Sequence, residues 1–160
     1  MILRTATARD LDALTAVEAA CFPAAEAATR EELAERLRAY GDHFWLLFDG
    51  ETLVSFVDGM VTDLPDLTDE MYADTSFHDE NGTWQMIFGV NTLPAYRKQG
   101  FAGQLLERAI ADAKAQGRKG LVLTCKDRLV HYYAKFGFVN EGVSESVHGG
   151  VTWYQMRLTF

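Results

Sequence analysis

The chain has 160 residues, of which 48% are hydrophobic, and its formal net charge is −8. The length and apolar content fit one globular domain, residues 1–160, with a full core, and the negative charge argues against a nucleic-acid partner. No apolar run is long enough for a membrane span or a signal peptide, so we expect a cytoplasmic protein without a membrane partner. The two cysteines, Cys21 and Cys125, and the lack of Cys/His clustering predict reduced, buried thiols and no metal site.

Apolar periodicity predicts a mixture of helices and strands. The pair Asp49-Gly50 predicts a hairpin turn, and the last strand alternates through Val151, Trp153 and Gln155. This mixture indicates an α/β fold with a partly antiparallel sheet. The expected elements are a strand at 2–6, helices at 8–21 and 31–39, strands at 44–48, 52–61 and 86–90, a helix through 105–113, a strand at 121–125, a short helix capped by Asp127, and strands at 138–141 and from 151 onward.

The middle of the chain is acidic. No Lys or Arg occurs between Ala39 and Tyr96, although the same stretch contains many Asp and Glu residues. An acidic surface of this kind would attract a cationic amine by electrostatic steering. The alternative is a solvated acidic loop that only aids solubility.

The most informative segment is the turn at 93–103, which joins the apolar strand at 86–90 to an amphipathic helix. Gly100 and Gly103 allow a ligand to approach the backbone, and Arg97 and Lys98 add positive charge. The start of the next helix offers free backbone N–H groups and the positive end of the helix dipole. These features predict an anion cradle that suits a pyrophosphate, whereas the segment alone is also typical of a helix start with a solvated basic patch.

The glycine spacing separates this turn from other phosphate-binding loops. A Walker loop needs Gly, four residues and then Gly-Lys-Ser/Thr, and a dinucleotide fingerprint needs Gly-x-Gly-x-x-Gly; neither is present. The pattern Arg97-x-x-Gly100-x-Ala102 resembles instead the Arg/Gln-x-x-Gly-x-Gly/Ala signature of the Gcn5-related N-acetyltransferase (GNAT) superfamily. In that family the loop binds the pyrophosphate of acetyl-coenzyme A (acetyl-CoA).

A second segment strengthens the resemblance. The core strand at 121–125 is followed at 133–138 by Tyr-x-x-Phe-Gly-Phe, which resembles an element of the same superfamily at the expected distance. Cys125-Lys126-Asp127, and Cys21-Phe22-Pro23 after the first helix, are most similar to the arylalkylamine (serotonin) N-acetyltransferase branch. The resemblance is dense over 84–140 and thin over 60–83, where substrate-facing elements are expected.

The resemblance implies a twisted mixed, partly antiparallel sheet flanked by helices, whose fourth and fifth strands splay apart to admit the pantetheine arm. Gly89 is compatible with a bulge in the fourth strand, or with simple close packing. Acetyl-CoA is the implied co-substrate: the backbone of 90–92 would contact the pantetheine and the thioester carbonyl, and the amides of 98–103 would hold the pyrophosphate. The implied cofactor-binding residues are Val90, Asn91, Thr92, Arg97, Lys98, Gln99, Gly100, Phe101, Ala102, Gly103 and Tyr133.

Tyr133 matches the family tyrosine near the thioester sulfur, and we expect it to be the general acid. A phenol with a pKa of about 10 can protonate an adjacent thiolate whose conjugate thiol has a pKa of about 8.5. The alternative is a core aromatic that only packs its helix, as we expect for Phe136.

The general base is where the family pattern does not carry over. An alkylamine is mostly protonated near pH 7, so it must lose a proton before it can attack. The arylalkylamine enzymes use two histidines on the fourth strand, and the matching positions here are Met86 and Phe88, neither of which accepts a proton. Water, bulk solvent or another side chain would replace them. The polar candidates are His78, Asp79, Glu80 and His148, although His148 also fits a plain turn residue.

The sequence therefore predicts an enzyme that transfers the acetyl group of acetyl-CoA to a primary amine of a small molecule by direct attack on the thioester. By resemblance, Phe22, Pro23 and Thr124 would approach the acceptor, and Trp84 and Tyr72 would add aromatic surface. The alternatives are acetylation of an amino acid, a polyamine or a peptide N-terminus, or a non-catalytic CoA-binding sensor. An exposed edge strand near the C-terminus would allow a homodimer.

Overall fold

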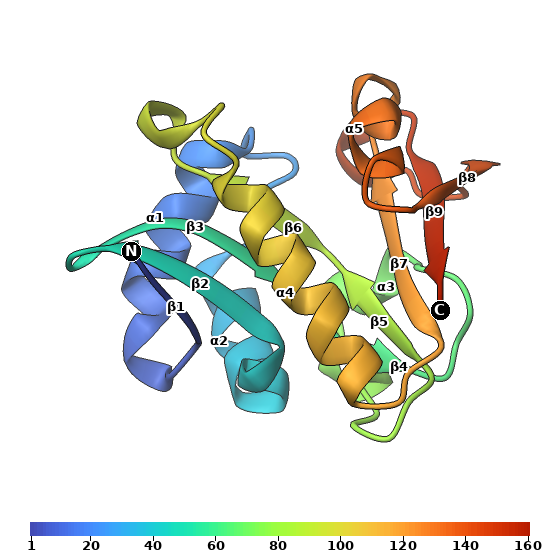
Figure 1. Cartoon of the computed structure of the whole chain (residues 1–160), viewed down its shortest axis with the longest axis horizontal. Coiled ribbons are helices and arrows are strands. Elements are labelled where there is room, and N and C mark those ends of the chain that lie inside the picture. The colour runs from blue at the N-terminus through green and yellow to red at the C-terminus, as the bar shows by residue number, and fades with distance from the viewer. The chain divides into compact units, whose positions relative to one another are not determined.

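The computed structural model describes all 160 residues. Its contacts divide the chain into two compact units, Met1–Gly59 with Gly89–Ala109 and Met60–Phe88 with Ile110–Phe160. The boundary falls inside helix α4 (Phe101–Ala115). Each unit contains one sheet, and the two are described separately (Figure 1).

The sheet of the first unit is entirely antiparallel. Its strand order is β1 (Ile2–Thr5), β2 (Phe44–Asp49), β3 (Thr52–Asp58) and β6 (Gly89–Thr92). The predicted hairpin turn joins β2 to β3, with Gly50 in the left-handed region at φ +59°. Because β6 is the last strand of this sheet, one of its two backbone edges has no strand partner there.

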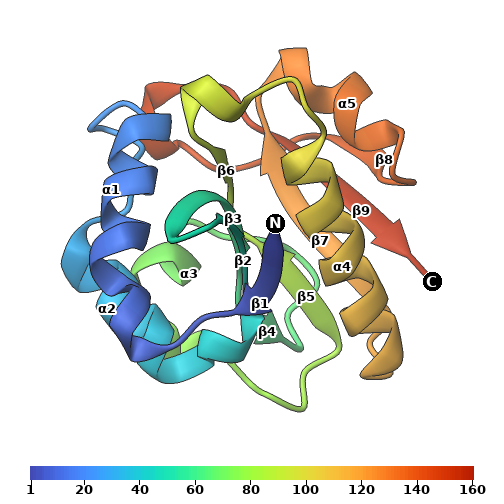
Figure 2. The same ribbon diagram turned by 60° about the vertical axis from the view of Figure 1, so that its left-hand side comes forward.

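Two helices complete the first unit and lie side by side (Figure 2). A 3-10 turn (Ala8–Asp10) leads into α1 (Leu11–Cys21), which packs against α2 (Arg30–Tyr40), β3 and β6. A capping box starts α2: Glu32 N–H donates to Thr29 Oγ1 at 3.2 Å and Thr29 N–H donates to Glu32 Oε1 at 2.9 Å. These caps satisfy amides that would otherwise lack partners at the helix start.

The second unit contains a mixed sheet. Its order is β4 (Val61–Thr62), β5 (Trp84–Ile87), β7 (Gly120–Cys125), β9 (Tyr154–Thr159) and β8 (Val139–Val143), and only the β5–β7 pair is parallel. The short helix α5 (Val130–Ala134) packs against β8 and β9, and α3 (Glu70–Ala73) precedes a 3-10 turn (Thr75–Phe77). Further 3-10 turns cover Asp127–Leu129 and His148–Gly150.

The predicted fold class, a mixed α/β fold with partly antiparallel sheets flanked by helices, is confirmed. The predicted fourth strand is divided at Phe88: β5 pairs with β7, whereas β6 pairs with β3 in the other sheet. The strand predicted at 52–61 ends at Asp58, because the N–H of Gly59 turns back to the carbonyl of His43.

Two local predictions are wrong. The last strand begins at Tyr154 rather than at Val151, because Tyr154 is the first residue that pairs with both neighbouring strands, opposite Cys125 of β7 and Val143 of β8. Asp127 is the first residue of a 3-10 turn and not its cap; the N-cap position belongs to Lys126, without a side-chain capping bond.

No helix in this fold combines the length and apolar character needed to cross a bilayer.

Candidate functional site

The predicted anion cradle forms a sharp turn before α4 in the first unit. A 3-10 turn (Pro94–Tyr96) follows β6, and the backbone then passes through left-handed angles at Lys98 (φ +64°) and Gly100 (φ +81°) before α4 begins at Phe101. A left-handed lysine costs about 1 kcal/mol or more. The turn therefore uses an uncommon backbone conformation at the N-terminus of a 15-residue helix, where amide groups lack intrahelical partners.

The two cationic side chains of this turn, Arg97 and Lys98, are exposed to solvent. Arg97 Nε donates to the carbonyl of Thr92 at 3.0 Å, and the same carbonyl accepts a bond from Cys21 Sγ at 3.3 Å. Neither Arg97 nor Lys98 forms an ion pair with a carboxylate. Their charges are thus not neutralised within the protein, which favours an anionic ligand.

Strand β6 leads directly into the cradle. Val90 and Thr92 are half-buried, whereas Gly89 and Asn91, on the alternate positions, are buried. The Ser55 hydroxyl donates to the Asn91 carbonyl at 2.6 Å and lies 2.9 Å from Thr92 Oγ1, which fixes this strand against β3. The unpaired backbone edge of β6 in its sheet is therefore held in a defined position.

A buried ion pair lies beneath β6. Arg36 Nη1, on α2, donates to Asp58 Oδ2, at the end of β3, at 3.2 Å. The side chain of Asp58 is fully buried and that of Arg36 is 4% exposed. Burial raises the pKa of Asp58, and the neighbouring guanidinium opposes that rise. Asp58 belongs to the acidic middle of the sequence, yet its carboxylate is not part of the surface.

Glu18 adds a second carboxyl group to this cluster, and sequence reasoning missed it. Its Oε2 accepts the N–H of Ala28 at 2.9 Å. Burial, followed by the charge of Asp58, raises the pKa of Glu18 to about 7. A signal was present in the sequence, because Glu18 occupies a position of the apolar stripe of α1, one residue after the buried Val17 and four after the buried Leu14.

Tyr133 lies in the second unit, on α5. Its side chain is 6% exposed and has edge contacts with the rings of Tyr132 and Phe138, at centroid distances of 5.1 and 6.2 Å. Burial, followed by the nearby Cys125 and Tyr132, raises the pKa of the phenol. The hydroxyl has no hydrogen bond within the protein, so it remains available to a ligand.

A set of aromatic rings gathers beside Thr124, also in the second unit. The Tyr72 ring lies 4.6 Å from that of Phe88 and stacks on His148 at 5.3 Å, while its hydroxyl is 3.4 Å from Thr124 Oγ1. Trp153 extends the set, with its ring 6.2 Å from His148 and its Nε1 donating to the His148 carbonyl at 2.7 Å. We call Tyr72, Phe88, His148 and Trp153 the aromatic set.

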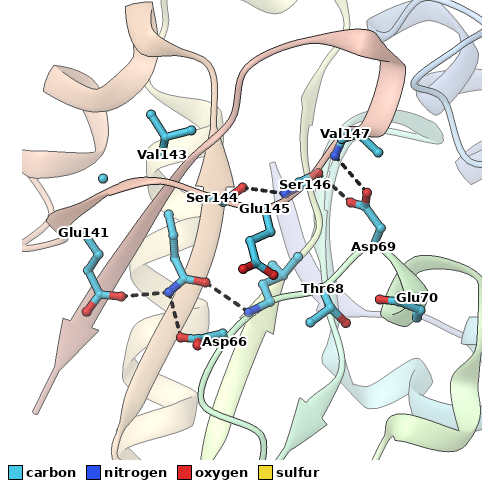
Figure 3. Close-up of a pocket in the computed structure, with 13 residues that line it drawn as sticks. Asp66, Thr68, Asp69, Glu70, Glu141, Val143, Ser144, Glu145, Ser146 and Val147 are labelled. Carbon is cyan, nitrogen blue, oxygen red and sulfur yellow. Dashed lines mark hydrogen bonds between the residues drawn. The ribbon is translucent and has the colours of Figure 1, made fainter.

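The second unit also contains a pocket of about 580 Å³ between the segments 66–70 and 141–147, with Gln155 from β9 (Figure 3). Its lining includes the carboxylates of Asp66, Asp69, Glu70, Glu141 and Glu145 and no Lys or Arg. Gln155 Nε2 donates to Asp66 and Glu141, each at 2.9 Å. Arg157 forms ion pairs with the same two carboxylates, at 2.9 and 3.0 Å, so their charges are partly neutralised by the protein. We call this cavity the acidic pocket.

Three of the predicted base candidates serve other contacts. His78 Nδ1 accepts the N–H of Val61 at 3.0 Å, and its Nε2 lies 3.2 Å from Glu80 Oε1. Glu80 also pairs with Arg118 at 3.2 Å. Asp79 accepts the amide of Asn81 at 2.9 Å. These contacts hold the connection between β4 and β5 in place.

The aromatic surface expected from Trp84 is covered by another side chain. The guanidinium of Arg157 lies 4.5 Å above the Trp84 ring. This cation–π contact stabilises the pair within the second unit. Tyr72, by contrast, belongs to the aromatic set.

The predicted site residues thus fall in both units. The first unit holds 90–103 together with Phe22 and Pro23, which follow α1; the Pro23 carbonyl accepts the N–H groups of Glu26 and Ala27, so this loop is folded into a turn. The second unit holds Tyr133 and Thr124. Both cysteines are free thiols. Cys125 is buried, as we expected of both, whereas Cys21 is half-buried because it ends α1.

Comparison with known proteins identifies the family. The family model described as acetyltransferase (GNAT) domain matches residues 10–160, and the chain therefore belongs to this family of acetyltransferases. This agrees with the superfamily indicated by the two sequence motifs.

Solved structures share the fold over nearly the whole chain. A GphF GNAT-like decarboxylase in complex with isobutyryl-CoA is 25% identical, with a TM-score of 0.85 and 99% of each chain covered. The loading GNATL domain of CurA from Lyngbya majuscula is 18% identical, with a TM-score of 0.86, covering 99% of this chain and 96% of its own. The ribosomal-protein-S18-alanine N-acetyltransferase from Escherichia coli is 16% identical, with a TM-score of 0.73, covering 99% and 92%.

Proposed function

We propose that the chain, as one domain, transfers the acetyl group of acetyl-CoA to the primary amine of a small arylalkylamine-like molecule. The observation that carries this proposal is the turn before α4, where Arg97 and Lys98 face no carboxylate and the helix start offers free amides. The backbone of 98–103, with Arg97, would hold the pyrophosphate. The family match supports the reaction, and the isobutyryl-CoA complex of a 25% identical structure supports a CoA thioester.

Strand β6 would bind the rest of the co-substrate. The edge of β6 that has no strand partner in its sheet would offer backbone groups to the amides of the pantetheine arm, as an edge strand offers them to an added strand. The Thr92 carbonyl already accepts bonds from Arg97 and Cys21. The backbone of Val90, Asn91 and Thr92 is the proposed contact, with the thioester carbonyl on a backbone N–H that stabilises the developing oxyanion. The interaction of Ser55 with this strand would keep these groups in place.

Tyr133 would donate the proton to the departing thiolate. The raised pKa of its phenol keeps the hydroxyl protonated at neutral pH, and its hydrogen is not engaged by another protein group. The same apolar surroundings would raise the pKa of a thiol leaving group, which offsets the raised pKa of the phenol in the transfer from oxygen to sulfur. Catalysis would thus combine backbone contacts to the thioester with one positioned acid.

The acceptor is proposed to be aromatic and cationic. The rings of the aromatic set, beside Thr124, offer apolar surface to an aryl group. The acidic pocket adds negative potential that favours an ammonium group. Phe22 and Pro23 would contribute further contacts to the acceptor.

The cytoplasmic location and the homodimer that we expect from the sequence stay predictions.

A second function has its own support. The 25% identical protein is a GNAT-like decarboxylase, so release of carbon dioxide from a carboxylated acyl-CoA is the second candidate. Acetylation of an amino acid, a polyamine or a peptide N-terminus is a variant of the first proposal, and the Escherichia coli enzyme that shares this fold acetylates an alanine of a ribosomal protein. A CoA-binding sensor without turnover is the remaining alternative.

One experiment separates these functions. Thiol release from acetyl-CoA is measured with tryptamine, phenylethylamine, polyamines, amino acids and short peptides, and malonyl-CoA is tested in parallel for conversion to acetyl-CoA by mass spectrometry. We expect acceptor-dependent release with the arylalkylamines and intact malonyl-CoA. Decarboxylation without transfer would establish the second candidate, and calorimetric binding of acetyl-CoA without either reaction would establish the sensor.

A further inference from the structure

A carboxyl group lies directly beneath the strand that we propose to hold the thioester. Glu18 is 5% exposed, and its Oε1 is 3.6 Å from the position that a Cβ atom would have at Gly89. Gly89 is the first residue of β6 and directly precedes Val90, the proposed thioester contact. Asn91 Nδ2 and Asp58 Oδ1 lie 2.9 Å from the same position, so three polar side chains converge where β6 begins. Figure 2 shows α1, which carries Glu18, in this unit.

The cluster combines two carboxyl groups with one guanidinium. Glu18 and Asp58 bring two carboxyl groups, and the cation that pairs with Asp58 is Arg36, whereas Glu18 accepts a neutral backbone N–H from Ala28. The Oδ1 atom of Asn91 is buried without a hydrogen-bond partner. Two carboxyl groups this close together repel when both are charged, so a proton on one of them is favoured. The geometry thus favours a carboxyl group that takes up a proton.

We propose that Glu18 accepts the proton that the ammonium form of the acceptor must lose before it attacks the thioester. This inference rests on the proposed acetyl transfer and supplies the base that Met86 and Phe88, at the family histidine positions, cannot provide. The ammonium N–H bond breaks, its proton goes to Glu18, and the nitrogen lone pair attacks the acetyl carbonyl carbon.

The remaining steps keep atoms and charges balanced. The new C–N bond forms and the C–S bond breaks as Tyr133 gives its proton to sulfur. The nitrogen loses a second proton, which restores Tyr133, and Glu18 releases its proton to solvent. The products are the acetamide, free CoA thiol and one proton.

The surroundings of Glu18 suit this exchange. Burial and Asp58 raise its pKa to about 7, so the group is divided between its two forms at neutral pH, where a general base acts best. The lowering influences are the N–H of Ala28, the charge of Arg36 and the amide of Asn91. The titratable and charged groups that interact with it are Cys21 on α1, Arg36 on α2 and Asp58 on β3. Glu32 and Tyr40 on α2 interact with Arg36.

The test is the pH dependence of kcat with acetyl-CoA and the best arylalkylamine, for wild type, Glu18→Gln, Asp58→Asn and the control Asp10→Asn. Asp10 is a buried carboxylate of the same unit that pairs with Arg4 at 2.8 Å and has no proposed role in the reaction. We expect kcat of wild type to fall below pH 7 along an acidic limb. Glu18→Gln should lose this limb and about 100-fold in kcat at pH 7, with unchanged affinity for acetyl-CoA by calorimetry.

Asp58→Asn supplies a readout that a purely structural role for Glu18 would not move. Without the carboxylate of Asp58, the charged form of Glu18 is favoured, so the acidic limb should shift to lower pH by about one unit. Asp10→Asn should leave the limb in place. If either Glu18→Gln retains the limb or Asp58→Asn leaves it unmoved, the inference is overturned while acetyl transfer stands. If wild type acetylates no amine, the proposed function fails, and the role of Glu18 falls with it.

Discussion

Replacing Glu18 by Gln should stabilise the protein at neutral and alkaline pH, whatever reaction it catalyses. The pKa of Glu18 rises from 4.5 in a solvated glutamate to about 7 in the fold. Between these values the native protein keeps a proton that the unfolded chain has lost. Unfolding therefore releases a proton, and rising pH favours unfolding across this range. The carboxyl group costs stability that Gln, which does not titrate, should recover.

The magnitude follows from the same two pKa values. Each unit of pKa corresponds to about 1.4 kcal/mol, so the rise from 4.5 to about 7 corresponds to roughly 3 kcal/mol of native-state destabilisation above pH 7. This contribution vanishes below about pH 4.5. The Gln amide keeps an oxygen that can accept the Ala28 N–H. The gain should therefore grow with pH and then level off.

The assay is urea unfolding at several values between pH 5 and 9, for wild type, Glu18→Gln and Asp10→Asn. The bond from Arg4 lowers the pKa of Asp10, so the stability that Asp10 contributes is present above its ordinary pKa and lost only in acid. Its variant should therefore differ from wild type by a constant amount over this range. A difference between Glu18→Gln and wild type that does not change from pH 5 to pH 8 would refute the burial argument.

Three further predictions test other parts of the structure. Tyr133→Phe should lower kcat about 100-fold and leave acetyl-CoA affinity unchanged; full turnover would exclude the phenol as the acid. Arg97→Ala and Lys98→Ala should each weaken the affinity for acetyl-CoA about fivefold, as measured by calorimetry. The affinity for acetyl-pantetheine, which has no pyrophosphate, should not change. Equal losses of affinity for both ligands would contradict the anion cradle. Gly120→Ala should lower the melting temperature of the protein by more than about 5 °C, because the new Cβ would lie 1.8 Å from the Leu158 carbonyl oxygen. An unchanged melting temperature would show that β7 and β9 can move apart at this point without loss of stability.

Sequence patterns located the main elements because those patterns are local. The amphipathic stripe of α4 and the hairpin turn at Gly50 each depend on residues within a few positions of one another. The turn before α4 was predictable for the same reason, since its charges, glycines and helix start are contiguous; its role as an anion cradle stays a prediction. Periodicity did not reveal that the fourth strand divides at Phe88 between two sheets, because strand pairing is a long-range property.

By itself the sequence determined the family and the fold class, because the motifs around Arg97 and Tyr133 that indicate them are short-range patterns. Only the tertiary structure placed Glu18 beside Asp58 and Gly89, residues separated from it by 40 and 71 positions along the chain. A pKa depends on which groups surround a carboxyl after folding, and no local pattern specifies those neighbours. In the sequence, the candidate base Glu18 is visible only as a polar residue in an apolar stripe. The raised pKa that makes it a candidate depends on the neighbours that the fold brings to it.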